Sequence, residues 1–499
     1  MAIKRYIADA DTTISNAYKE NLSDLATGAN MGASDSMEVF SIWGQRSSSI
    51  DGPSIEASRA LVKFPVDSIS SDRTAGNIPA SGSVSFYLKL TNAEHPNTLP
   101  SDYTLSVLPV SESWTEGYGL DMETYMDSGS ASWLNATTGT LWGGGLAAAQ
   151  GGAYHTSSAA LLATDSAMNT KNIRTMYTSL VGDDGTKNIE VDISELVEQW
   201  IDSTKANYGV GVMMSGAYED GTLSASFYTK KYFTRTSEYF YKRPRIEARW
   251  DDSKRDDRAN FYAATNSNHL LLADQANTLY LYNSVRGQLK TFEGFHASNT
   301  LDVKLYSAIG DAETPVVSAI GYPTADAGIY TASITYTSAT PVSYLYDVWT
   351  TGSVSLHTGS AISVKTFSAM GENPNPNHVT SMVGFRSTYS IKETARFRLF
   401  IRKQNWSPTI YTKATETLDS VIVDSAYYKI FRVSDNFEVI PYGTGSDNQT
   451  RLSYDQSGSY FDLNMSLFEP DFAYGMNFSY YLNGKYVEQP EVFKFRVEE

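Results

Sequence analysis

Every second residue carries an apolar side chain in Ser83-Val84-Ser85-Phe86-Tyr87-Leu88-Lys89-Leu90. This period of two is typical of a β-strand that buries one face and exposes the other. The same alternation recurs along the chain, and strands are expected over residues 59–64, 103–110, 245–250, 278–282, 301–306, 329–336 and 396–401. Turn-rich stretches separate these ranges, which favours antiparallel sheets.

The composition also favours sheet over helix. Tyrosine, with 34 residues, outnumbers phenylalanine with 21 and tryptophan with 8, and such residues suit the half-buried surface of a sheet. The 35 glycines exceed the 16 prolines and supply turns. We therefore expect an all-β protein, in which an N-terminal jelly-roll-like β-sandwich with one short helix is followed by two Ig-like β-sandwich domains.

The one expected helix lies at residues 192–201. Its apolar residues are Ile193, Leu196, Val197, Trp200 and Ile201, which share one face of a 3.6-residue helix. Asp192 and Glu195 resemble a capping box at its start. We expect this helix to close one end of the sandwich, with Trp200 as a core residue.

The length of 499 residues indicates several domains. The charged run at 251–258 contains no apolar side chain and is interpreted as a linker, and a second, weaker boundary lies at 371–378. The predicted domains are 1–250, 259–370 and 371–499. We expect the last of them to be closed by a strand at 493–497, where apolar and basic residues alternate, preceded by a type I′ hairpin at Asn483-Gly484.

The formal net charge of −17 disfavours broad binding to nucleic acids or anionic membranes. The absence of cysteine excludes disulfides, thiolate metal sites and cysteine nucleophiles. No apolar stretch follows Lys4 and Arg5, so no secretory signal is expected, and none is long enough for a membrane span. We expect a protein that is made in the cytoplasm and does not enter a membrane.

Motifs of catalysis and metal binding are missing from the sequence. It contains no GxSxG, GxxxxGK[ST], GxGxxG or HExxH motif, and its six histidines stand apart. We therefore assign no catalytic residue, no metal ligand and no cofactor, and expect a protein that is not an enzyme. The Asp-Gly loops at 51–52, 182–186 and 218–221 suit either calcium or plain turns, and turns are favoured.

Three tryptophans surround a Gly/Ala/Ser-rich insertion at about 131–156. Trp114 ends an apolar strand and is a candidate core residue. Trp133 and Trp142 lie within the insertion, which we interpret as a long surface loop, so they are candidates for a protein interface or for stacking on a glycan. The interface is favoured over the glycan.

Cations and aromatic residues interleave at 230–235 and again at 241–243. Such a pattern can stack nucleobases, but a solvated β-hairpin with tyrosine packed inward explains it equally well. The net charge favours the hairpin, or a contact with a charge-complementary partner.

The order of signals in residues 1–250 resembles the DNRLRE-type β-sandwich domain, a jelly-roll module related to carbohydrate-binding modules. The matching features are Arg59–Phe64 with Pro65-Val66-Asp67, Val84–Leu90, Val107–Trp114 with Thr115-Glu116, Val191-Asp192-Ile193, Trp200, Asn207-Tyr208-Gly209-Val210 and Arg243-Pro244-Arg245-Ile246-Glu247.

The whole chain is also similar to virion structural proteins of tailed bacteriophages, especially contractile-tailed marine phages. The likeness is carried by residues 1–13, 27–32, 281–289, 450–453, 461–463 and 493–497. It implies a non-enzymatic structural component of the virion, in a neck, tail, fibre-attachment or head-decoration position, synthesised in the host cytoplasm.

The implied partners are other virion structural proteins, with the chain itself a homo-oligomer or present in many copies. The alternative is a carbohydrate-binding adhesin that contacts a glycan on the host cell surface. A glycan-degrading tail enzyme is the least favoured reading.

Overall fold

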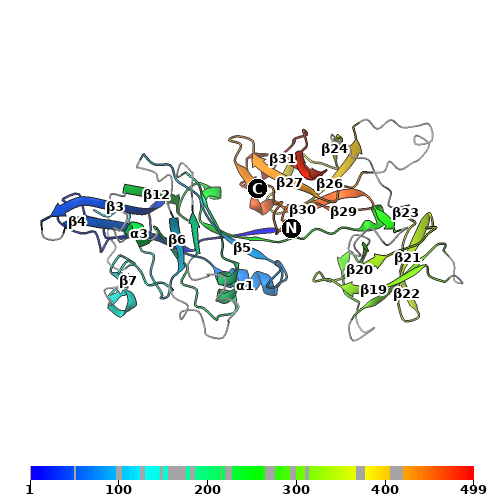
Figure 1. Ribbon diagram of the computed structural model, residues 1–499, viewed down its shortest axis with the longest axis horizontal. Coiled ribbons are helices and arrows are strands. Elements are labelled where there is room, and N and C mark those ends of the chain that lie inside the picture. The colour runs from blue at the N-terminus through cyan, green and yellow to red at the C-terminus, as the bar shows by residue number, and fades with distance from the viewer. Residues whose placement is uncertain are drawn as a thin grey trace. The chain divides into compact units, whose positions relative to one another are not determined.

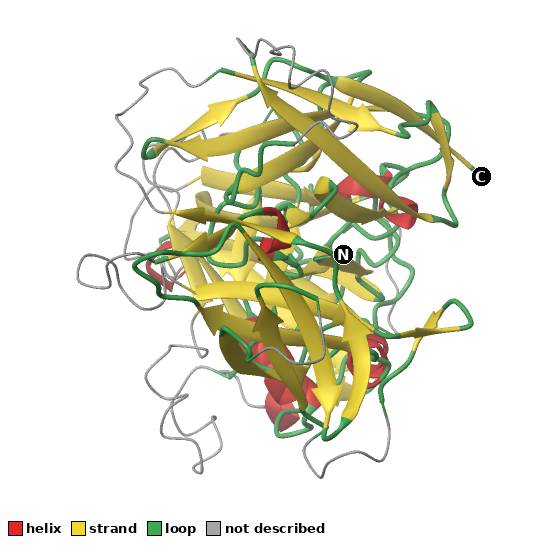
Figure 2. Cartoon of the chain, turned by 90° about the vertical axis from the view of Figure 1, so that its right-hand side faces the viewer, coloured by secondary structure: helices red, strands yellow, loops and turns green. Residues whose placement is uncertain are grey.

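Strands make up most of the computed structural model, and the chain folds as an all-β, multi-domain sandwich protein (Figure 2). The structure describes residues 2–49, 52–96, 104–123, 130–145, 150–155, 176–179, 186–214, 216–219, 227–264, 276–292, 299–309, 314–366, 377–404 and 420–499. Its contacts divide the chain into two compact units, Ile3–Arg249 and Trp250–Glu499, the second of which includes the first two residues.

The N-terminal unit contains two sheets. The four-stranded sheet has the order β1 (Ile3–Ile7), β13 (Arg245–Arg249), β5 (Ser85–Leu90), β10 (Ile189–Asp192). The seven-stranded sheet has the order β12 (Phe227–Phe233), β3 (Ser36–Ser48), β4 (Gly52–Lys63), β11 (Val210–Met214), β6 (Thr104–Pro109), β9 (Met176–Ser179), with β2 (Ala10–Ser15) paired to β4. A small ribbon pairs β7 (Asn135–Thr137) with β8 (Thr140–Leu141).

The register of the four-stranded sheet follows the alternation in the sequence. Phe86, Leu88 and Leu90 of β5 are fully buried, which confirms the predicted strand and its buried face. β1 runs antiparallel to β13, with Ile3 opposite Arg249. The first and last strands of this unit are therefore neighbours.

The predicted helix is confirmed as α2 (Ser194–Ile201), which buries Leu196, Val197 and Trp200. Trp200 is 5% exposed, as expected for a core residue. The expected capping box is not formed, because Ile193 occupies the cap position and no side chain caps it. Instead, the Asp192 carboxylate accepts a hydrogen bond of 2.9 Å from the Ser194 N–H.

The structure contains two helices besides α2 that the sequence analysis did not predict. α1 (Val66–Thr74) follows Pro65 and buries only Val66 and Ile69, so its sequence has no pronounced apolar stripe. Polar contacts hold it instead, because Arg73 donates two hydrogen bonds to the Glu198 carboxylate of α2. A further helix, α3 (Gly216–Glu219), is one turn long.

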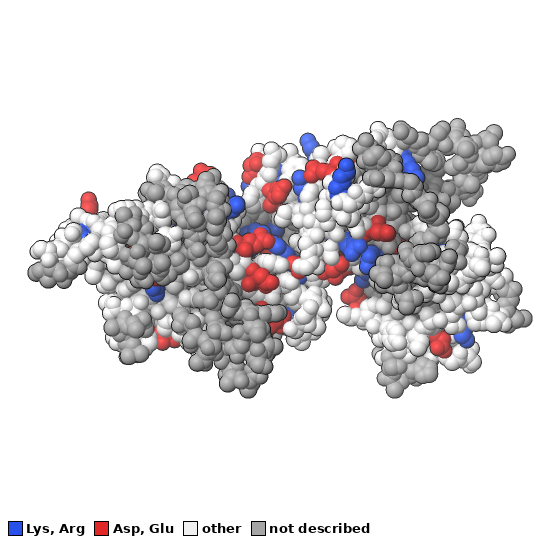
Figure 3. Space-filling model, in the orientation of Figure 1, with Lys and Arg blue, Asp and Glu red and all other residues white. Residues whose placement is uncertain are grey.

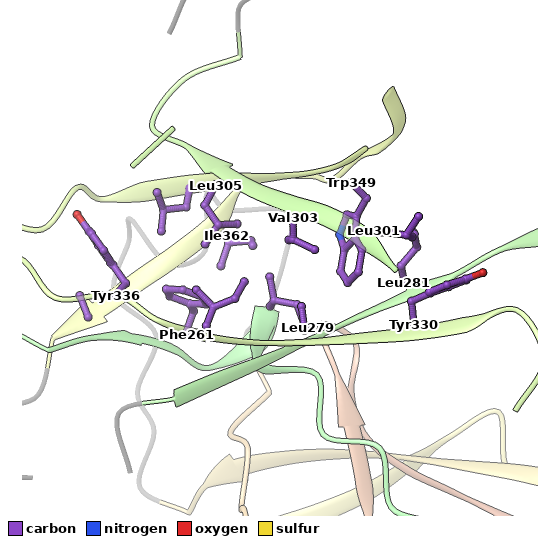
Figure 4. Packing of buried hydrophobic residues seen from close by; sticks show 14 residues of the cluster. Phe261, Leu279, Leu281, Leu301, Val303, Leu305, Tyr330, Tyr336, Trp349 and Ile362 are labelled. Atoms are coloured by element: carbon purple, nitrogen blue, oxygen red, sulfur yellow. The ribbon is translucent and has the colours of Figure 1, made fainter. Parts of the chain in front are cut away.

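The second unit begins with an eight-stranded sheet that surrounds its own core (Figure 4). Its order is β14 (Phe261–Ala263), β23 (Ile362–Thr366), β21 (Tyr344–Thr351), β18 (Leu301–Tyr306), β19 (Val317–Pro323), β20 (Ile329–Thr335), β15 (Ala276–Tyr282), with β22 (Val354–Thr358) paired to β21. β16 (Ser284–Val285) and β17 (Gln288–Leu289) form a separate ribbon. The sheet can fold over because β19 pairs with β18 at residues 317–321 and with β20 at 322–323.

Two further sheets follow from residue 378 onward. One has the order β24 (His378–Val383), β26 (Thr394–Lys403), β30 (Gly458–Asn464), β29 (Ser453–Asp455). The other has the order β25 (Thr388–Ser390), β33 (Phe493–Glu498), β31 (Ala473–Leu482), β27 (Ala426–Arg432), β28 (Glu438–Ile440), with β32 (Lys485–Glu488) paired to β31. Aromatic rings join the two sheets, since Phe461 of β30 stacks on Tyr428 of β27 at 4.2 Å between centroids.

The predicted closing strand is confirmed as β33. It pairs antiparallel with β31 and parallel with β25, and it buries Phe495 and Val497 while Lys494 and Arg496 are exposed. The predicted hairpin is confirmed as well, because Asn483 and Gly484 have φ values of 50° and 79° between β31 and β32.

The charged run at 251–258 differs from the expected solvated linker. The Asp256 N–H donates to the Tyr454 carbonyl, and the Tyr454 N–H donates to the Lys254 carbonyl, so this segment extends the edge beside β29. Arg258 forms ion pairs with Asp256 and with the fully buried Asp347. The run therefore buries charges that are paired. The second expected boundary, at 371–378, lies mostly outside the described residues.

Candidate functional site

The tryptophans singled out in the sequence lie in one apolar cluster of the N-terminal unit. Trp114, Trp133 and Trp142 are 9%, 7% and 1% exposed and pack with Ile14 and Leu61. The indole N–H of Trp142 donates to the Ser132 carbonyl at 2.8 Å. Trp114 is a core residue, as expected. Trp133 and Trp142 differ from the expectation of exposed rings, and in this fold neither ring is open to a glycan or a partner.

The described part of the insertion covers one side of the seven-stranded sheet, which explains this burial. Tyr154 lies against Gly211 of β11, where a Cβ atom would come within 2.2 Å of the tyrosine ring. The Arg59 guanidinium of β4 lies over the rings of both Trp133 and Tyr154, at 5.1 and 5.5 Å from their centroids. Its guanidinium also forms a two-pronged ion pair with Glu219. The face of the sheet that carries Leu61 and Gly211 is thus covered by an apolar cluster.

The basic run does not form a free cationic surface. Lys230 is fully buried and donates to the Asn92 side chain at 2.6 Å, and Lys231 forms an ion pair with Glu38. Arg235 donates to the Glu116 carboxylate at 2.6 Å. Lys242 lies over the Tyr239 ring, 4.5 Å from its centroid. The expected solvated hairpin does not form, because β12 pairs with the distant strand β3 and β13 belongs to the other sheet. Tyr232 and Tyr241 do pack inward, and the cations named here have partners within the chain.

A charge network that the sequence analysis missed lies on one face of the four-stranded sheet. Glu247 of β13 is 2% exposed and accepts hydrogen bonds of 2.8 Å from Arg5 and Arg249. Glu190 accepts from Arg249 at 2.7 Å and pairs with Lys89 at 2.9 Å. The only signal in the sequence is the alternation Arg-x-Glu-x-Arg at 245–249, which places three charges on one face of a strand.

The electrostatics of this network favour a structural role. Burial alone would raise the pKa of Glu247, but Arg5, Lys89 and Arg249 outweigh it and hold that pKa well below its usual range. Burial and the neighbouring Arg5 lower the pKa of Arg245 to about 10. Glutamates already occupy the positions that an anionic ligand would need, so the network joins β1, β13, β5 and β10 to one another.

The candidate calcium loops fall largely outside the described residues. This holds for residues 182–185, for 220–221 and for Asp51. Within the described ranges, no group of three or more His, Asp or Glu side chains is arranged to hold a metal ion. On the face shown in Figure 3, acidic and basic side chains of the described residues are interspersed rather than gathered into one broad area.

The most distinctive surface feature is the hairpin of β3 and β4. Its strands are 13 and 12 residues long, and Trp43 lies opposite Ile55. β12 flanks β3 only as far as Ile42, and β2 flanks β4 only from Ser58. In the described part of the chain, no strand pairs with the ribbon beyond Trp43 and Ile55, and Figure 1 shows it extending past its neighbours.

Local contacts within this ribbon and to Tyr18 leave most of its side chains beyond Trp43 exposed or half-buried. Gly44, with φ of +68°, begins a bulge that ends where Ser47 pairs with Pro53. The Arg46 N–H donates to the Ser54 hydroxyl at 2.9 Å, and the Arg46 guanidinium lies over the Tyr18 ring. Beyond Trp43, β3 continues to Ser48, which makes this arm of the ribbon about 16 Å long at 3.3 Å per residue. It presents mostly uncharged polar groups and open strand edges, as a protein-binding element does.

Comparisons with known proteins give no family for this chain. No family model matches it, and no curated protein matches it. Among solved structures, it is similar to the crystal structure of Salmonella alpha-2-macroglobulin reacted with methylamine, at 8% identity and a TM-score of 0.15. That match covers 99% of this chain, which spans 26% of the other. Among the described residues, no helix has the length and apolar character to cross a membrane.

Proposed function

We propose that this chain is a non-enzymatic structural component of a tailed-phage virion that binds neighbouring virion subunits through its β-sandwich domains. The resemblance of residues 1–13, 281–289 and 450–497 to tailed-phage virion proteins suggests the particle. The observation that carries subunit binding is the β3–β4 ribbon. A two-stranded ribbon is marginally stable in water by itself, and a length of 13 residues exceeds what the sandwich uses.

The position on the particle is a neck, tail, fibre-attachment or head-decoration site. A projecting element that contacts a neighbouring subunit is compatible with each of these positions, and the ribbon is such an element. The alternative, a carbohydrate-binding adhesin, drew its support from exposed rings at Trp133 and Trp142. Both rings are buried, so that alternative has no structural observation in its favour.

A shortened ribbon tests the proposal. Because Trp43 and Ile55 are directly opposite, residues 44–54 can be replaced by a two-residue Asn-Gly turn of type I′. We expect this variant to fold with an unchanged melting temperature and to be lost from purified particles. The matched control is Arg286→Asn, which alters the tip of the exposed β16–β17 ribbon without shortening it.

Quantitative mass spectrometry of purified particles measures incorporation of the wild type and both variants. Absence of the wild-type chain from particles would overturn the virion assignment. Normal incorporation of the shortened variant would remove the ribbon from the proposal. A glycan array should show no binding for the wild type, and binding there would restore the adhesin.

A further inference from the structure

The chain leaves the four-stranded sheet after β5 and pairs with a strand of the other sheet. Asn92, two residues beyond β5, lies opposite Tyr232 of β12 in an antiparallel bridge. The Ala93 N–H donates to the Lys231 carbonyl at 2.9 Å, which fixes the register of this pairing. A short backbone contact thus joins the two sheets of the N-terminal unit.

This register places the side chains of Asn92 and Lys230 next to each other. Because side chains alternate along a strand, Lys230 shares the face of Tyr232 and is the diagonal neighbour of Asn92. Lys230 is fully buried. Its Nζ donates to the Asn92 side-chain oxygen at 2.6 Å and to the Lys187 carbonyl at 3.3 Å. An amine from one sheet is therefore held against a side-chain amide that follows the other.

The amine and the amide carbon are close enough to react. An amide C=O bond is about 1.2 Å long, so the Asn92 Cγ lies no more than about 3.8 Å from the Lys230 Nζ. Reacting atoms in a near-attack arrangement are about 3–3.5 Å apart, so a small rotation of the amide suffices. An uncharged lysine amine attacks carbonyl carbons, and burial favours the uncharged form of an amine.

A base lies beside this pair. His95 follows Asn92 by three residues, and both of its ring nitrogens are shielded from solvent. Burial, together with the charges of Lys231 and Lys230, lowers the pKa of His95, and the Glu38 carboxylate opposes this effect only in part. The imidazole is therefore uncharged at neutral pH and can accept a proton.

We propose that Lys230 and Asn92 form an intramolecular amide cross-link between the two sheets. The bond from Nζ to Cγ forms, and the bond from Cγ to Nδ2 of Asn92 breaks. His95 takes a proton from Nζ and returns it to Nδ2, which leaves as ammonia. One amine and one primary amide thus give one secondary amide and one ammonia, and no oxidant or other co-reactant is needed.

The cross-link would stabilise a chain that has no cysteine and hence no disulfide. The two residues are 138 positions apart in the sequence, and a covalent link that closes so long a loop strongly restricts the unfolded chain. The linked chain should therefore remain more compact than an unlinked one in denaturant. This inference goes beyond the proposed function and does not depend on it.

Mass spectrometry of the denatured full-length chain tests the cross-link. We expect an intact mass that is lower than the mass of the sequence by one ammonia, and peptide mapping should find the segments of Lys230 and Asn92 joined. Lys230→Met and Asn92→Ser should each restore the full mass. A wild-type chain with the full mass would overturn the proposal, whether or not the two variants fold.

Two controls exclude other sources of the same loss of mass. Lys231→Met removes the neighbouring lysine, which pairs with Glu38, and should keep the cross-link. Asn483 precedes Gly484 and could lose ammonia by closing onto its own backbone, so Asn483→Ser should leave the measured loss unchanged. A loss that disappears in Asn483→Ser, or that persists in Asn92→Ser, would contradict the cross-link. None of these outcomes involves incorporation into particles, which tests the proposed function separately.

Discussion

Two uncharged stretches of this chain, at 130–145 and 348–364, differ in how far their side chains are exposed to solvent. The first belongs to the insertion and carries Trp133 and Trp142, which the structure buries against the outer side of the seven-stranded sheet. The second contains β22, which remains exposed along most of its length. Both stretches are rich in small and β-forming residues, so composition alone does not separate them.

The difference lies in what is available to cover each stretch. The insertion has a partner within its own unit, where Ile14, Leu61 and Gly211 offer an apolar and closely approachable surface. β22 has β21 on one side and no described strand on the other. A lack of charge therefore does not by itself decide whether a stretch is covered: the insertion is covered within its own unit, whereas most of β22 is exposed in the described part of the chain.

Trp142→Ala should have the largest effect of these variants, and it tests whether the insertion packs on the sheet. Its ring is 1% exposed and its N–H is hydrogen-bonded, so we expect a loss of roughly 3–5 kcal/mol in the free energy of unfolding. Denaturant unfolding of the N-terminal unit is the measurement. The neighbouring Leu141→Ala, at 47% exposure, should cost under about 0.5 kcal/mol. Similar losses for the two variants would mean that the insertion does not pack on the sheet.

Gly211→Ala tests how closely the insertion approaches the sheet. The added methyl group would meet the Tyr154 ring at 2.2 Å, so we expect a loss of roughly 1–3 kcal/mol. Combining it with Tyr154→Ala should give less than the sum of the two single losses, because the clash is then gone. Strict additivity in this double-mutant cycle would show that the two residues are not in contact.

Asp11→Asn tests the protonation state of a buried carboxyl beside Glu116, through the pH dependence of the free energy of unfolding. Burial, together with the Glu116 carboxylate, raises the pKa of Asp11 to about 7 from 3.8. A raised pKa means that this group stabilises the fold fully below pH 3.8 and that the contribution is lost as the pH rises through 7. The variant should therefore gain about 2–3 kcal/mol on the wild type between pH 5 and pH 8. A difference in stability that does not change with pH would contradict the buried, protonated carboxyl.

Val354→Ser should have the smallest effect of these variants, and it tests whether β22 is exposed. The side chain is 53% exposed, so a dilute monomer should change in stability by no more than about 0.5 kcal/mol. Thermal unfolding at low and high protein concentration measures this. A large loss would show that the Val354 side chain contributes to the core of its own sheet.

Sequence periodicity predicted α2 and part of the strands, such as β5, β18 and β26, because the alternation of buried and exposed side chains is visible in consecutive residues. It did not predict others, among them β3 and β21. It also predicted β33, where Phe495 and Val497 share one face. It did not predict α1, which relies on Arg73 reaching Glu198, since no local pattern records a contact between distant residues. The burial of Trp133 and the pairing of Arg258 with Asp347 were not predicted either, because both depend on contacts between distant residues.

The pairing of β1 with β13 has a consequence for how this unit can be moved between proteins. Ile3 lies directly opposite Arg249, which places the entry and exit of the chain about 5 Å apart. A module whose ends meet can be spliced into a surface loop of an unrelated host without stretching either one. The same closeness would allow the two ends of this unit to be joined and new ends to be opened in one of its surface loops, so that a circular permutant keeps both sheets intact.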